Sequence, residues 1–307
     1  MGEDSVDASV AVPNDNTGDS SDATDTTGSN PLATSDYDMS AYIGTQETDV
    51  ATLVVNERSS TGITMHTTTG SGFGVTTGVE TPGDVYGAIE DGAITQDSTT
   101  ANQDVAIHQI QVSGIYGALA TVDDTEPFTT TGNSGTNEFT ADTPEKKLAY
   151  LIQSGSDTDR SGTVEADEAP INLNVVQTGS SPNQDPKRLA LQASVDADAF
   201  NVISDAENDT VFVNVKTDRL RFARGEEDEI TPVGSYSTMP AAVDEEFNVT
   251  FTVEQASGLT AAEDGESVSS TFSVVERAGE LNNGDDITVE AASGQEISGT
   301  TDIAPGS

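Results

Sequence analysis

The segment from Asp157 to Glu168 carries the residue spacing in this chain that most strongly suggests chemistry. Its twelve residues match the calcium-binding loop of EF-hand proteins, in which positions one, three, five, seven, nine and twelve supply oxygen ligands. The expected ligands are Asp157, Asp159, Ser161, the backbone carbonyl of Thr163, Glu165 and both oxygens of Glu168. Gly162 occupies position six, where the loop turns sharply. The pattern therefore predicts one Ca²⁺ ion with a structural role.

Two features of this loop depart from the EF-hand pattern. Ser161 stands where an acidic or amide residue is usual, and Pro170 disfavours the helix that normally follows. The loop is therefore expected to lead into a strand at 171–177. A chance match in an Asp-rich chain is the alternative.

Two Asn-X-Thr acceptor sequences for N-linked glycans are present, at Asn208 and Asn248. Asn208 lies in a polar stretch that predicts a turn. Asn248 alternates with Phe247 and Val249, so its side chain should lie on the solvent face of a strand. Both side chains should be accessible to a glycan if the protein is exported, although such sequences also arise by chance.

Evidence for catalysis is weak. His66 and His108 are the only histidines, and no metalloprotease, phosphate-loop or serine-hydrolase motif is present. Carboxylates are so frequent that pairs of them carry no information about glycoside hydrolysis. We therefore expect a protein that is not an enzyme. An exported hydrolase would need carboxylates clustered in a pocket beside one of the histidines.

Charge dominates the composition of the chain. The 307 residues include 54 acidic and 11 basic side chains, giving a formal net charge of −43. Such a charge opposes compaction unless salt screens it, and near molar salt the Debye length falls to about 3 Å. We interpret the acidity as adaptation to brine. It also argues against nucleic-acid binding, which requires lysine and arginine. Four cations, Lys216, Arg219, Arg221 and Arg224, lie close together and are expected to neutralise the acidic residues at 226–229 rather than to form a docking patch.

Two short helices are predicted. At 82–91, Thr81 is a suitable N-cap, Pro82 suits the first helical position, and Asp84 can complete a capping box. At 144–152, Pro144 opens a segment with an apolar stripe at helical spacing.

Strands are predicted over most of the remainder, which has short alternating runs separated by turn signals. The expected strands are 42–44, 51–55, 105–112, 115–122, 171–177, 189–194, 211–216, 219–224, 247–253, 271–276 and 287–291, with a hairpin at Thr217-Asp218. The predicted fold is mainly β, with tandem immunoglobulin-like β-sandwich modules and both helices in the first module. We expect a Ser/Thr/Asp-rich disordered linker at 1–35, a β-rich module at 36–230 and an immunoglobulin-like module at 231–307, which can be followed by the truncated start of another.

Three stretches resemble haloarchaeal cell-surface glycoproteins of the S-layer-related type. They are Val112–Leu119, the phrases Ser181–Pro186, Asn208–Val215 and Leu220–Gly225, and the C-terminal stretch Val289–Gly306. The resemblance implies export, glycosylation and strings of immunoglobulin-like domains. It also predicts that this chain is a fragment, since no signal peptide, membrane span or apolar C-terminal anchor is visible.

The expected function is that of a structural surface-layer or envelope glycoprotein of an extreme halophile, located outside the cell. Its expected partners are neighbouring copies of the surface protein and hydrated cations that bridge carboxylates. A surface adhesin or ligand-binding module is the alternative, and an aromatic-lined groove would favour it.

Overall fold

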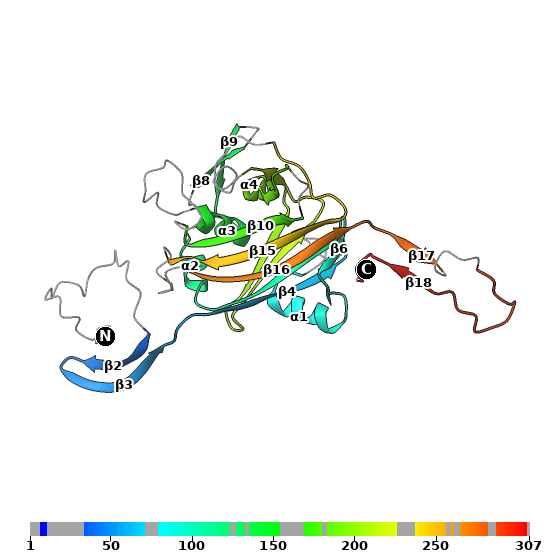
Figure 1. Cartoon of the computed structure of the whole chain (residues 1–307). Helices are drawn as coiled ribbons and strands as arrows, with labels where there is room; N and C mark the ends of the chain where they lie inside the picture. The colour runs from blue at the N-terminus through cyan, green and yellow to red at the C-terminus, as the bar shows by residue number, and fades with distance from the viewer. Residues whose placement is uncertain are drawn as a thin grey trace. The chain divides into compact units, whose positions relative to one another are not determined.

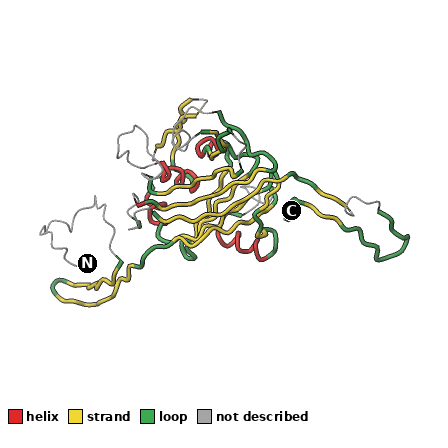
Figure 2. The backbone as a smooth tube through the Cα atoms, in the orientation of Figure 1, coloured by secondary structure: helices red, strands yellow, loops and turns green. Residues whose placement is uncertain are grey.

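The computed structural model describes residues 7–10, 34–70, 79–122, 124, 127–132, 135–153, 169–179, 183–225, 237–255, 259–260, 265–281 and 287–305. The chain divides into two compact units, Met1–Arg58 and Ser59–Ser307. Strands predominate, which confirms the prediction of a mainly β protein (Figures 1 and 2).

The first unit contains one antiparallel sheet of three strands in the order β1-β2-β3. The strands are β1 (Asp7–Val10), β2 (Ser35–Ile43) and β3 (Gln46–Val55). Gly44, with φ of 62°, begins the tight turn between β2 and β3. Most of the predicted linker at 1–35 lies outside the described residues, and within it Asp7–Val10 pairs with β2.

The second unit is built on two larger sheets. The five-stranded antiparallel sheet has the order β12-β13-β7-β4-β5, formed by Phe200–Asp205, Thr210–Lys216, Val105–Val112, Ser60–Thr68 and Thr95–Gln96. The six-stranded sheet has the order β14-β11-β10-β15-β16-β6, formed by Phe222–Arg224, Lys187–Leu189, Ile171–Thr178, Glu245–Val253, Glu266–Val275 and Thr99–Ala101. Its strands are antiparallel except for the parallel pair β16–β6.

Two smaller ladders complete this unit. The strands β8 (Pro127–Gly132) and β9 (Gly135–Thr140) pair with each other, as do β17 (Gly279–Leu281) and β18 (Gly299–Thr301). The helices are α1 (Pro82–Glu90), α2 (Tyr116–Thr121), α3 (Pro144–Gln153) and α4 (Leu191–Asp196).

The main core lies between the two large sheets. Alternate side chains of β7 and β13 from one sheet and of β10 and β15 from the other belong to one buried apolar cluster. Within it, the Phe222 and Phe247 rings stack with centroids 4.5 Å apart, and Phe247 stacks on Phe272 at 5.4 Å. The helices α3 and α4 add Leu148, Leu151 and Leu191 to this cluster. Removal of this apolar surface from water drives the sheets together.

Helix α1 covers the other face of the five-stranded sheet. Val85, fully buried, packs with Ile107, Ile203 and Phe212 in a second apolar cluster. The predicted capping box is present: the Thr81 hydroxyl accepts from the backbone N–H of Asp84, and the Asp84 carboxylate accepts from the backbone N–H of Thr81 at 2.9 Å. The Asp84 carboxylate also accepts from the Thr81 hydroxyl at 2.7 Å, and this bond, together with those from the backbone N–H groups of Thr81 and Glu80, lowers the pKa of Asp84. Both predicted helices are confirmed as α1 and α3.

Four strand predictions are wrong. Residues 116–121 form α2, because Gly114, with φ of 76°, ends the extended chain after β7 and the following Ala- and Leu-containing segment turns onto the core. Residues 191–196 form α4 rather than the continuation of a strand. Residues 287–291 form no strand, and the ladder in this region is β17–β18.

The fourth error concerns the predicted hairpin. The turn at Thr217-Asp218 is present, but β13 pairs with β12 and β7, whereas β14 pairs with β11 in the other sheet. The buried Thr217 hydroxyl donates to the Asp104 carbonyl at 2.9 Å and holds the crossover between the sheets. Apolar and polar residues alternate on both sides of this turn, and the same pattern suits a hairpin within one sheet and a crossover between two sheets.

The strand β15 lies between β10 and β16. Residues on both sides of the expected module boundary at 230/231 contribute to one sheet and one core. The division of the chain into two compact units falls at 58/59. An immunoglobulin-like arrangement in tandem stays a prediction.

The outward side of the six-stranded sheet differs from its core side. In Figure 1, β10, β15 and β16 are drawn in front, with no described helix over them. Their outward positions, which we call the neutral face, are Asn172, Asn174, Val176, Asn248, Thr250, Thr252, Ser267, Ser269 and Thr271. None of them is charged.

Candidate functional site

The proposed calcium ligands, Asp157, Asp159, Ser161, Thr163, Glu165 and Glu168, all lie outside the described residues. The helix α3 ends at Gln153, ahead of the loop, and β10 begins at Ile171, after it. The elements on both sides of the loop are therefore those that the sequence predicted. Among the residues that the structure does describe, no group of three or more histidine, aspartate and glutamate side chains could hold a metal ion.

The Glu168→Gln substitution is expected to weaken Ca²⁺ binding by roughly tenfold or more, equivalent to at least about 1.4 kcal/mol. Glutamate at the last position supplies two oxygens, and an amide supplies one uncharged oxygen. Isothermal titration with CaCl₂ at constant molar NaCl measures this. Glu207→Gln, at an exposed position, is the control. Equal affinities for the two variants would contradict the loop assignment.

Asn248 lies on the middle strand of the neutral face, in the row at one end of it. Its strand β15 buries Phe247, Val249 and Phe251 and leaves Asn248 and Thr250 partly exposed, as the sequence predicted. The Asn248 side-chain amide donates from Nδ2 to the Thr250 hydroxyl at 3.0 Å. The two residues of the acceptor sequence are therefore adjacent on the outward side of a folded sheet.

The acceptor at Asn208 is built differently. It lies in the exposed turn between β12 and β13, and its Nδ2 donates to the Asp205 carboxylate at 2.7 Å. Burial opposes ionisation of Asp205, but hydrogen bonds from Asn208 and Tyr86 outweigh it and lower the Asp205 pKa. Thr210 is fully buried and accepts a hydrogen bond from Gln111 at 2.7 Å. In the folded chain, the threonine of this acceptor sequence is inaccessible.

Both histidines are buried. His108 lies between the two large sheets. Its ring is perpendicular to that of Phe272, with the ring centroids 5.4 Å apart, and its Nδ1 lies 3.3 Å from the Val213 carbonyl oxygen. Burial lowers the pKa of His108 to about 4, and the hydrogen bond with the Val213 carbonyl opposes this shift. His66 Nε2 lies 2.9 Å from the Gln109 side-chain oxygen. Burial also lowers the pKa of His66, and the contact with Gln109 opposes the shift.

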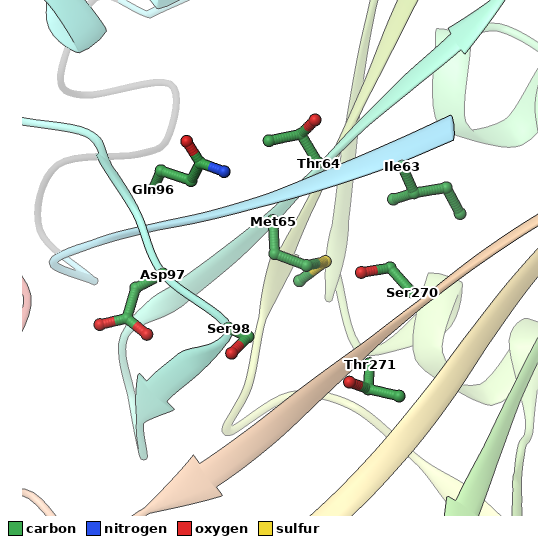
Figure 3. Close-up of a pocket in the computed structure, with 8 residues that line it drawn as sticks. All are labelled: Ile63, Thr64, Met65, Gln96, Asp97, Ser98, Ser270 and Thr271. Atoms are coloured by element: carbon green, nitrogen blue, oxygen red, sulfur yellow. The ribbon is translucent and has the colours of Figure 1, made fainter. Parts of the chain in front are cut away.

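A hollow lies where the two sheets approach each other along β4 and β16 (Figure 3). Met65 and Ser270 flank it, and the segment Gln96–Ser98 crosses its rim. Asp97 is the one carboxylate and neither histidine lines it. This hollow thus lacks the combination of clustered carboxylates and histidine that the hydrolase alternative requires, and it has no aromatic side chain.

The four clustered cations contact groups of their own neighbourhood. Lys216 and Arg219 pair with Asp198, with N–O distances of 3.3 and 2.6 Å. Arg221 donates to the backbone carbonyl of Leu220, and Arg224 to that of Asp185. The acidic residues at 226–229, the expected partners, lie outside the described residues.

The chain is 32% identical over 285 residues to a protein named cell surface glycoprotein from Haloferax gibbonsii, which covers 92% of this chain. It is 31% and 33% identical to cell surface glycoproteins 2 and 1 of Haloarcula hispanica, each covering 73% of the chain. No protein-family model and no solved structure matches it.

The chain spans 21% to 27% of the length of these curated relatives. Within the part of the chain that the structure describes, no helix has the length and apolar character needed to cross a membrane. Over most of its length, this chain is related in sequence to part of haloarchaeal cell surface glycoproteins, and the resemblance predicted from its short phrases is confirmed.

Proposed function

We propose that this chain is a structural portion of an exported cell-surface glycoprotein of a salt-loving archaeon, with no catalytic role. The observation that carries the proposal is its similarity to three haloarchaeal proteins with that name. The second unit provides a compact body with a continuous core, suited to act as a spacer or wall element. The net charge of −43 suits a body that operates in concentrated salt.

The location is tested in a haloarchaeal host that expresses the complete gene with an epitope tag in an exposed turn of the second unit. Intact cells should bind antibody against the tag, and protease added outside should remove it while a cytoplasmic marker survives. Protection of the tag until the cells are lysed would contradict the proposal.

Dilution from molar NaCl to low salt is expected to unfold the chain, because the repulsion among its excess carboxylates is no longer screened. Far-UV circular dichroism should show loss of the β signal on dilution and its return when NaCl or KCl is restored. An unchanged spectrum and urea midpoint in dilute buffer would contradict the interpretation of the charge as a brine adaptation.

Asn248 is expected to carry an N-linked glycan. In this step the side-chain nitrogen forms a bond to the anomeric carbon of a phosphate-activated saccharide, the carbon–oxygen bond to phosphate breaks, and the nitrogen loses a proton. Because the Thr210 hydroxyl is buried and that of Thr250 is partly exposed, a folded chain should be modified at Asn248 in preference to Asn208. Mass spectrometry of peptides from the natural host measures both occupancies. Higher occupancy at Asn208 would contradict this order.

Hydrated divalent cations are proposed to link the carboxylates of neighbouring copies. Removal of these ions with EDTA at constant molar NaCl should therefore release copies from one another while each stays folded. Analytical ultracentrifugation and circular dichroism, taken together, separate the two effects. No change in either measurement would make both the bridging and the Asp157–Glu168 loop unimportant.

A further inference from the structure

The neutral face forms a regular grid of nine positions. The strand register places Val176, Asn248 and Thr271 in one row, and the rows Asn174–Thr250–Ser269 and Asn172–Thr252–Ser267 follow. From the spacings of a β-sheet, the grid measures about 10 Å across the strands and about 14 Å along them. Charged residues border the grid on two sides. Arg188 of β11 pairs with Val176 at the end of the Asn248 row, and one row beyond Asn248 lies Glu246, which accepts from the Thr178 hydroxyl at 2.9 Å.

The nine positions of this grid are uncharged, although the chain as a whole is strongly acidic. In a chain with 54 carboxylates, eight of the nine positions carry hydroxyl or amide groups and one carries an aliphatic side chain; Thr252 among them is buried. The centres of protein–protein interfaces are enriched in aromatic residues, methionine and arginine, none of which is present among the nine positions. Neutral donors and acceptors on a nearly flat surface instead match a ligand that is itself a dense array of hydroxyl groups, such as a saccharide.

The acceptor asparagine identifies how such a ligand would be held. Asn248 is the middle residue of its row, with Thr271 and Val176 on its two sides and Thr250 in the next row. A saccharide joined to Asn248 begins on the grid, so its first units lie within reach of the exposed Ser269 and Thr271 hydroxyls. A covalent tether gives an effective concentration of millimolar order, so individually weak hydrogen bonds suffice to hold the chain of sugars against the sheet.

We propose that the neutral face binds the first sugars of the glycan on Asn248, which lie against the sheet and cover β15 and β16. The inference rests on the proposed glycosylation of Asn248. This arrangement explains why the face has no carboxylates, because a carboxylate buried under the sugars without a hydrogen-bond partner would raise the free energy of the folded chain. Contacts between the glycan and the sheet then stabilise the folded body.

The test compares the same chain produced by a haloarchaeal host with and without its N-glycosylation machinery, in an Asn208→Gln background. The readout is the NaCl concentration at which half the protein unfolds on dilution, followed by circular dichroism. With the natural face, glycosylation should lower this midpoint. In the double variant Ser269→Asp/Thr271→Asp, most of the glycan-dependent shift should be lost.

The control is Ser204→Asp, an exposed serine-to-aspartate change on β12 of the other sheet, which should keep the full shift. Because each background is compared with and without glycan, any intrinsic cost of the added charges cancels. Mass spectrometry of the Asn248 peptide, carried out on every sample, separates the two proposals.

If Asn248 is glycosylated and the glycan shifts the NaCl midpoint equally in all backgrounds, the glycan does not bind the neutral face, and only the proposal of glycosylation is retained. An unmodified Asn248 in the natural host overturns both. If the shift caused by Ser269→Asp/Thr271→Asp depends on protein concentration and not on the glycan, the face is an interface between copies, and the proposal that it binds the glycan is wrong. Sedimentation velocity distinguishes that outcome.

Discussion

Replacement of Asp104 by alanine is expected to lower the free energy of unfolding by about 3 kcal/mol, at the lower end of the range for breaking a buried ion pair. The Asp104 side chain is fully buried, and its carboxylate accepts from the Arg277 guanidinium, from the Ala304 backbone N–H at 2.9 Å and from the Gly70 N–H at 3.3 Å. The alanine variant leaves all three donors without this acceptor. Arg277 is 34% exposed, so water compensates part of its loss.

The same substitution should have a local effect. Arg277 and Ala304 lie just outside the β17–β18 ladder, so Asp104 joins both ends of this segment to the start of β7. Urea unfolding in molar NaCl gives the global effect, and limited proteolysis within 278–303 gives the local one. The control is Asp302→Ala, which removes an exposed carboxylate of the same segment. Equal stability of the two variants would contradict the role assigned to Asp104.

Acidification is expected to destabilise the fold through His108. Its pKa in the folded chain is about 4, against an ordinary value of 6.5, so the unfolded chain binds the proton more tightly. The stability that neutral His108 confers is complete above pH 6.5, is lost progressively as the pH falls to about 4, and changes no further below that. The total loss is about 3 kcal/mol, from about 1.4 kcal/mol for each unit of pKa.

The His108→Leu variant should lose this part of the pH dependence, because leucine cannot be protonated in the core. Carboxylates also titrate in acid, so the quantity to measure is the difference in unfolding free energy between wild type and variant at pH 7 and pH 4.5 in molar NaCl. Ile110→Val, at a buried position on the same strand, is the control and should change stability equally at both values. A difference that does not vary with pH would show that His108 keeps its ordinary pKa.

Local signals in the sequence were reliable where short-range interactions fix the backbone. The helix at 82–90 follows from a cap, a proline and a reciprocal carboxylate within four residues, and the capping box and the position of the proline are as predicted. The alternation in β15 placed Phe247 inside and Asn248 outside for the same reason, since a strand turns successive side chains to opposite faces. The resemblance to haloarchaeal surface glycoproteins also came from the sequence, through short phrases that the comparisons confirm.

Long-range partners were not accessible to the same reasoning. The residues after Thr217 look like the second strand of a hairpin, but β14 finds its partner β11 in the other sheet, and only the packing of the two sheets decides between these choices. The burial of His108 against Phe272 depends on a strand about 160 residues further along the chain, which no pattern near His108 indicates. Asp104 gave no signal at all in the sequence, because its donors come from Gly70, Arg277 and Ala304.

The sequence by itself determined the large excess of acidic side chains, the mainly β character and the positions of the two Asn-X-Thr sequences, because composition, alternation and short motifs can be read from the residues without knowledge of the fold. The tertiary structure decided that β10, β15 and β16 lie side by side with their neutral side chains outward and Asn248 among them. Strand order depends on the free energy of burying whole faces against each other, which no local stretch of the chain encodes.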